Sequence, residues 1–157
     1  ITLDAARDTK TPKVATVFSA LSAAKAKAVL VRTPKRDRTT AELTFRLGAP
    51  RPDCTATGFI GKDLGINVWS AGGGTATRFA KGMAGPDLTL GSGGVRKVMA
   101  SCDAPVWLVG ADDVVTWGLV VDLVLAVLEP EDAGAPRAKE VVLLTKPPVP
   151  GRKILDE

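Results

Sequence analysis

The sequence predicts an α/β protein, a two-layer sandwich in which helices pack on one face of a mixed β-sheet. Short runs rich in Val, Leu and Ile, typical of buried strands, alternate along the chain with segments of helical periodicity. The order helix, strand, charged turn, helix, strand occurs twice, over residues 13–60 and 94–145. Helices precede and follow a strand in each half, so they can share one face of a common sheet.

This repeated order fits either two pseudo-repeats or the chance similarity of two ordinary αβαβ segments. A chain of 157 residues, 45% of them hydrophobic, suits one domain or two small units that share a core. We therefore expect a first unit over residues 1–60, a second over 61–146 and a Pro-rich tail over 147–157. The residues that would correspond in a repeat are 28–31 with 106–109, Asp37 with Asp112 and Asp113, and Leu43 and Phe45 with Val121 and Leu123.

The composition excludes several classes of function. Histidine is absent, which excludes Ser-His-Asp and Cys-His nucleophile systems and His-ligated zinc. The net charge is +4, but the basic residues are scattered and aromatic residues make up 4%, so the basic, aromatic-bearing face of a nucleic-acid site is missing. Cys54 and Cys102 are expected to be buried thiols or one disulfide. We expect no catalytic residue, metal, cofactor or nucleic-acid partner.

The first half is expected to contain two strands and two helices. The first helix shows apolar residues at helical spacing behind a favourable Pro12. The second would carry Leu43, Phe45 and Leu47, with Thr39 or Thr40 as its N-cap. In chain order we expect a strand over residues 1–5, a helix over 12–26, a strand over 28–31, a charged turn over 33–38 and a short helix ending at Gly48.

The second half is expected to contain a hairpin followed by alternating helices and strands. The three glycines at 72–74 lack the spacing of a phosphate-binding loop and lead into a strand-like run, so they indicate a hairpin turn. Ser92 is the expected cap of a helix that ends at Cys102. In chain order we expect strands over 55–60, 65–69 and 75–79, that helix, a strand over 106–109, a helix over 114–128 and a strand over 141–145, after which prolines leave the sheet.

The most apolar stretch, residues 104–128, has a strand–turn–helix pattern. Asp112 and Asp113 could cap the helix, while Gly118, Asp122 and Ala126 form one thin stripe along it. The rest of its circumference is Val, Leu and Trp, so we expect a second surface, naturally a partner subunit, to pack against it. Its carboxylates interrupt the run well short of the ~20 apolar residues that a membrane span needs.

Residues 65–145 resemble the periplasmic domain of the ExbD/TolR family in their order of elements. The family shows a hairpin, a Leu-bearing entry into a helix, an apolar strand ending in an acidic residue, a helix and a last strand. The local match is Pro105-Val106-Trp107-Leu108-Val109-Gly110-Ala111-Asp112, followed by Gly118-Leu119-Val120-Val121 with Trp117 in the aromatic position. The family normally has one copy of this fold, and its proton-carrying Asp lies in a membrane helix with no counterpart in this chain.

The resemblance implies a periplasmic, dimeric, non-enzymatic domain of a proton-driven inner-membrane motor complex. Its partners would be a motor protein of the ExbB/TolQ type and an envelope protein or peptidoglycan, and a segment outside this chain would tether it to the inner membrane. The residues expected to form dimer and partner surfaces are Asp112, Asp113, Trp117, Gly118, Val121, Asp122 and Leu125.

The alternative is a small-ligand-binding or carboxylate-based enzyme domain. Asp112 and Asp113 follow a predicted strand, where sites of α/β proteins form, and Asp122 or Asp87 could join them. A carboxylate pair at a helix start is more often a cap, so we favour the interaction domain. A pocket that holds both carboxylates would instead support the enzyme.

Overall fold

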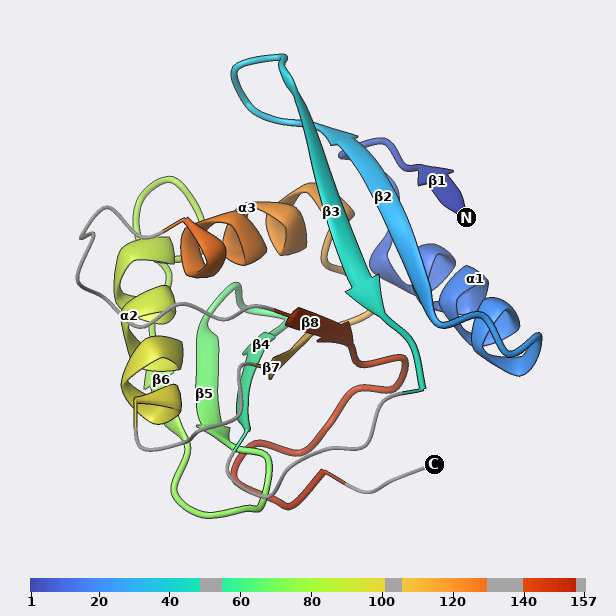
Figure 1. Cartoon of the computed structure of the whole chain (residues 1–157). Coiled ribbons are helices and arrows are strands. Elements are labelled where there is room, and N and C mark those ends of the chain that lie inside the picture. Colours follow the sequence, from blue (N-terminus) through green and yellow to red (C-terminus); the bar gives the residue numbers. More distant parts are fainter. Residues whose placement is uncertain (49–54, 101–105, 130–139, 155–157) are drawn as a thin grey trace.

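The computed structural model describes residues 1–48, 55–100, 106–129 and 140–154 (Figure 1). These residues form three helices and eight strands. The helices are α1 (Thr11–Ala23), α2 (Leu88–Met99) and α3 (Trp117–Leu128). The strands are β1 (Thr2–Asp4), β2 (Ala28–Pro34), β3 (Thr40–Arg46), β4 (Ala56–Ile60), β5 (Ile66–Ser70), β6 (Thr77–Phe79), β7 (Val106–Ala111) and β8 (Glu140–Leu143).

All eight strands belong to one mixed sheet in the order β1-β2-β3-β8-β7-β4-β5-β6. The four central strands β3, β8, β7 and β4 run parallel to one another, as do β1 and β2, while β2–β3, β4–β5 and β5–β6 are antiparallel pairs. The sheet is continuous across residue 60, and β4 pairs with β5 and β7. The expected division at residue 60 therefore does not follow the sheet.

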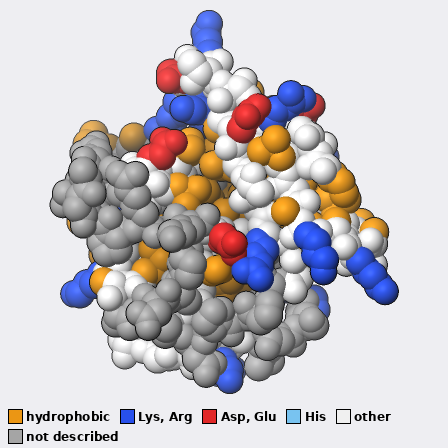
Figure 2. Space-filling model, viewed as in Figure 1, with side chains coloured by type: hydrophobic (Ala, Val, Ile, Leu, Met, Phe, Trp, Pro, Cys, Tyr) orange, Lys and Arg blue, Asp and Glu red, His pale blue; other side chains and the backbone are white. Residues whose placement is uncertain are grey.

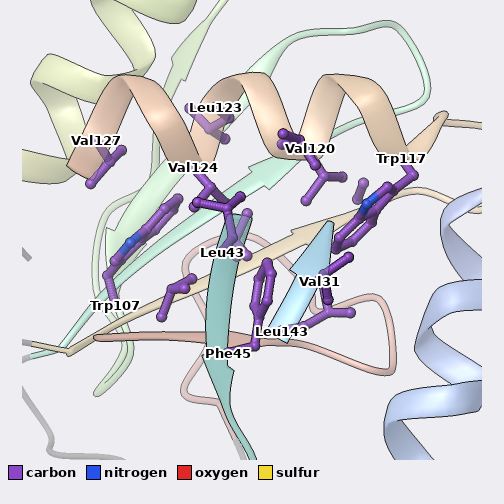
Figure 3. Packing of buried hydrophobic residues seen from close by; sticks show 14 of the residues in the cluster. Val31, Leu43, Phe45, Trp107, Trp117, Val120, Leu123, Val124, Val127 and Leu143 are labelled. Atoms are coloured by element: carbon purple, nitrogen blue, oxygen red, sulfur yellow. The ribbon is translucent and has the colours of Figure 1, made fainter. Parts of the chain in front are cut away.

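The main core lies between one face of the sheet and the three helices, which confirms the predicted two-layer α/β sandwich. In Figure 3, Val120, Val124 and Val127 of α3 point toward the strands. At one end of this core, Phe18, Phe45 and Trp117 bring α1, β3 and α3 together, with ring centroids 5.3–6.3 Å apart. Burial of such apolar surface is the main stabilising contribution to the fold.

The opposite face of the sheet is covered in part by the C-terminal segment. Ile154 packs against a small apolar cluster that includes Leu108 and Val142. Its backbone N–H donates to Ala71 (2.9 Å), and the indole N–H of Trp69 donates to the carbonyl of Arg152 (3.0 Å). The prolines do leave the sheet, as expected, but residues up to 154 of the predicted tail return to pack on it.

The helix expected over residues 39–48 is wrong, because this segment contains β3. Ala41, Leu43 and Phe45 are buried, while the residues between them are exposed. This is the period-two alternation of a strand with one buried face, and the Thr residues favour it. The repeat correspondence that matched Leu43 and Phe45 to residues of α3 is therefore wrong, and a duplication stays a prediction.

Two other helix boundaries differ from those expected. α2 begins at Leu88, where the side chain of Asp87 accepts a hydrogen bond from the N–H of Leu90 (3.0 Å), so Ser92 lies inside the helix and is not its cap. α3 begins at Trp117 and not near Val114. The remaining helices and strands lie close to their predicted ranges.

Candidate interaction site

The chain itself covers α3, the helix that was expected to need a partner. Most of its residues are buried, including Trp117, Gly118, Val121 and Asp122. It packs on the sheet beside α2, and the indole N–H of Trp117 donates to the buried hydroxyl of Thr33 in β2 (2.9 Å). These four residues stabilise the fold, so the expectation that they form an exposed partner surface is wrong.

The polar stripe of α3 is occupied by two arginines from the first half of the chain. Arg7 donates from Nη1 and Nη2 to the two carboxylate oxygens of Asp122 (2.9 and 2.7 Å), and Arg36 adds a third bond from Nε (2.9 Å). Asp122 raises the pKa of Arg7 through these bonds. A Cβ on Gly118 would lie 2.9 Å from the Arg7 side chain, so the glycine makes room for it. Ala126 of the same stripe accepts from Arg96 of α2 (2.9 Å).

The loops that precede α1 and α3 pair with each other, which explains how α3 begins without an acidic cap. The N–H groups of Trp117 and Gly118 donate to the carbonyls of Thr9 (2.7 Å) and Arg7 (2.9 Å). These are the helix N–H groups that a cap would satisfy. Asp112 instead accepts from the N–H of Val114 in the turn (3.2 Å), and Asp113 is exposed. The predicted capping of α3 by these carboxylates is therefore wrong.

The carboxylates of the alternative hypothesis have separate environments. A cavity of about 160 Å³ beside Asp113 is lined by no other carboxylate. Asp122 is held by two arginines, and Asp87 caps α2. Within the described residues, no group of three or more potential acidic or sulfur ligands could hold a metal ion. The arrangement thus gives no support to a carboxylate-based site.

A surface groove does exist where the sheet ends, between β6 and α2. Its cavity has a volume of about 550 Å³, and its lining is mainly apolar. β6 is the last strand of the sheet, and α2 lies over it at the left of Figure 1. The residues that line the groove are Val68, Thr77, Phe79, Gly93, Gly94, Lys97 and Val98.

Two adjacent glycines shape the wall of this groove. A Cβ on Gly94 would lie 2.6 Å from Cε2 of Phe79, so β6 can approach the helix only because the side chain is missing. A Cβ on Gly93 would meet nothing within 4 Å. The groove residues were not among those expected from the sequence. A Gly pair inside a helix, where glycine is unfavourable, was the available signal.

The opposite edge of the sheet, at β1, carries charged side chains. Its adjoining cavity, of about 490 Å³, is lined partly by the charged side chains of Asp4, Arg32 and Glu42. Asp4 and Arg32 form a bidentate ion pair (2.7 and 3.0 Å). Charged side chains at a sheet edge discourage pairing with another chain. The β2–β3 turn also carries basic side chains, seen at the top of Figure 2.

Several predictions are not tested by this arrangement. Cys54 and Cys102 lie outside the described residues, and Leu125 is only half-buried. No helix in the described part of the chain is long and apolar enough to cross a membrane. Comparison with protein-family models, curated proteins and solved structures finds no match to the chain.

Proposed function

We propose that this chain is a non-enzymatic interaction domain that holds an extended segment of another protein along β6, in the groove beside α2. The observation that carries the proposal is a strand edge next to an apolar groove. Within the described residues no strand pairs with the outer side of β6. An extended peptide can add to such an edge through backbone hydrogen bonds, while pockets for alternate side chains supply specificity.

The geometry of β6 suits this mode of binding. Thr77 and Phe79 line the groove, whereas Arg78 between them forms an ion pair with Asp63 on the other face. A strand added beyond β6 would follow the same alternation, because successive side chains point to opposite faces. Every second side chain of the bound segment would therefore enter the groove.

We also propose a setting for this domain, on the resemblance of residues 65–145 to the ExbD/TolR family. It would lie in the periplasm as a homodimer, tethered to the inner membrane, and couple a motor of the ExbB/TolQ type to an envelope protein or peptidoglycan. Since α3 is buried, the dimer would use another surface. The sequence upstream of Ile1 tests this: an apolar span of ~20 residues with an Asp supports the setting, and a soluble catalytic domain there contradicts it.

Selection from a random-peptide display library tests the binding site itself. Gly93→Leu would fill the groove without a steric clash of its Cβ. Ala20→Leu adds the same side chain to the exposed face of α1 and is the matched control. We expect peptides that bind the wild type and the control but not Gly93→Leu, and that shift the amide NMR signals of β6 and α2. Selected peptides that bind Gly93→Leu as tightly as the wild type would refute the proposed site.

A further inference from the structure

The groove is bordered by basic side chains without acidic neighbours on the same elements. β5, β6 and α2 contain Arg78, Arg96 and Lys97 and no Asp or Glu. Arg78 is paired with Asp63, and Arg96 donates to the carbonyl of Ala126. Lys97 lines the groove, is exposed, and forms no ion pair within the described part of the chain. It is therefore available to a ligand.

The charge around the groove is reinforced just beyond β6. Lys81, two residues after Phe79, is exposed and likewise has no ion-pair partner among the described residues. Opposite charges on two surfaces favour their association, and like charges oppose it. A ligand segment with a carboxylate on the side that faces the groove would match Lys97, and further carboxylates would be favoured by Lys81.

Large apolar side chains are also exposed on α2 and in the segment that joins β6 to α2. Leu90 is 55% exposed and lies one helical turn before Gly94, on the same side of α2. Met83, in the segment that joins β6 to α2, is fully exposed. Large exposed apolar side chains next to an apolar groove are typical of a surface that another molecule covers.

We infer that the segment bound along β6 is acidic, with both apolar and acidic side chains among those that face the groove. This inference rests on the proposed function and names the chemistry of its partner. On the groove-facing side of the bound segment, the apolar side chains would fill the space beside Phe79 and Gly93, and a carboxylate would reach Lys97 in the groove lining. A second copy of this chain fits less well, because β5, β6 and α2 carry basic residues and no acidic one, so this surface has no acidic side chain of its own to offer Lys97 of another copy.

Synthetic peptides of the repeat Val-Thr-Glu-Thr, in which valine and glutamate share one face of the extended strand, are compared by fluorescence anisotropy with peptides that carry glutamine or lysine in place of glutamate. We expect the acidic peptide to bind most tightly and to weaken as salt is added, since exposed charges are screened. Lys97→Glu should weaken it about threefold to tenfold. Lys13→Glu, on the exposed surface of α1, should leave it unchanged. Methylation of alternate peptide nitrogens should abolish binding.

The outcomes distinguish a failure of the acidic partner from a failure of the groove as a peptide-binding site. If the glutamine peptide binds as tightly as the acidic one and Lys97→Glu has no effect, the acidic partner is refuted while the groove remains a binding site. If no peptide binds the wild type, or all bind equally to Gly93→Leu, the proposed function itself fails. A dimer in sedimentation velocity that Gly93→Leu dissociates would show that a second copy occupies the groove, which also overturns the inference.

Discussion

Replacement of Asp122 by Asn tests whether the arginine pair on α3 is a structural element of the fold. The carboxylate accepts three bonds of 2.7–2.9 Å, two from Arg7 and one from Arg36. Asn keeps the side-chain shape and one oxygen acceptor but loses the charge. Two guanidinium groups would then lack their counter-ion at a site where the acceptor side chain is only 8% exposed.

The expected loss of stability follows from the burial of the three partners. Breaking a fully buried ion pair costs about 3–5 kcal/mol, and an exposed pair contributes about 0.2–1 kcal/mol. The Arg7 and Arg36 side chains are 25% and 56% exposed, so water can solvate them in part. We therefore expect the free energy of unfolding to fall by about 2–3 kcal/mol, with a Tm lower by roughly 5–10 °C.

Urea denaturation followed by far-UV circular dichroism measures this loss. The matched control is Asp4→Asn, because Asp4 also forms a bidentate pair with an arginine but its side chain is 70% exposed. The control should lose much less stability than Asp122→Asn, because water screens an exposed ion pair. The double variant Arg7→Met, Asp122→Leu should recover part of the loss, since apolar replacement removes both charges. If Asp122→Asn loses no more than Asp4→Asn, burial does not strengthen this cluster and the reasoning is wrong.

Three further predictions concern the groove, the buried hydroxyls and acid stability. In thermal unfolding, Gly93→Ala should stabilise the protein by about 0.5–1 kcal/mol. Gly94→Ala, whose Cβ would press on Phe79, should destabilise the protein by about 1–3 kcal/mol. Equal effects of the two substitutions would contradict the packing described. Among the described residues, the buried hydroxyl of Thr57 has no hydrogen-bond partner, whereas that of Thr33 accepts from Trp117. In urea, Thr57→Val should therefore raise the unfolding free energy and Thr33→Val should lower it, each by about 1–2 kcal/mol, and the opposite order would refute this. A hydrogen bond from the N–H of Gly65 and, as a smaller effect, one from Arg78 lower the pKa of Asp63 in the folded protein. The ionised carboxylate therefore stabilises the fold above the unfolded-state pKa near 3.8, and this contribution is lost as the pH falls through the lower folded-state pKa. The Tm should therefore fall less steeply below about pH 4 in Asp63→Asn than in the wild type. If the two proteins have the same pH profile, the Asp63–Arg78 pair is not formed.

The sequence predicted those parts of the fold whose signal is local. The strand at β7 and the helix at α3 follow from one continuous apolar stretch, and the α/β sandwich follows from the alternation of elements. β3 was mistaken for a helix because its inward-facing Leu43 and Phe45 were read as one side of a short helix, although their spacing is two.

The candidate sites could not be predicted in the same way, because they depend on contacts between distant parts of the chain. Asp122 was identified as unusual, but nothing in its own helix indicates that Arg7, 115 residues away, reaches it. The groove depends on the close packing of Phe79 against Gly94. Predicting this contact requires the relative positions of the β5–β6 hairpin and α2 in three dimensions. Periodicity within one element carries no such information.

The position of β8 has a consequence for how the protein is made. This strand, the last one in the described part of the chain, lies in the middle of the sheet, between β3 and β7. Until the ribosome releases it, the nascent chain can hold at most two partial sheets, each with one open side where β8 will insert. The sheet can therefore close only once β8 has left the ribosome, and a product shortened before residue 140 would display two unpaired strand edges to chaperones, proteases and other nascent chains.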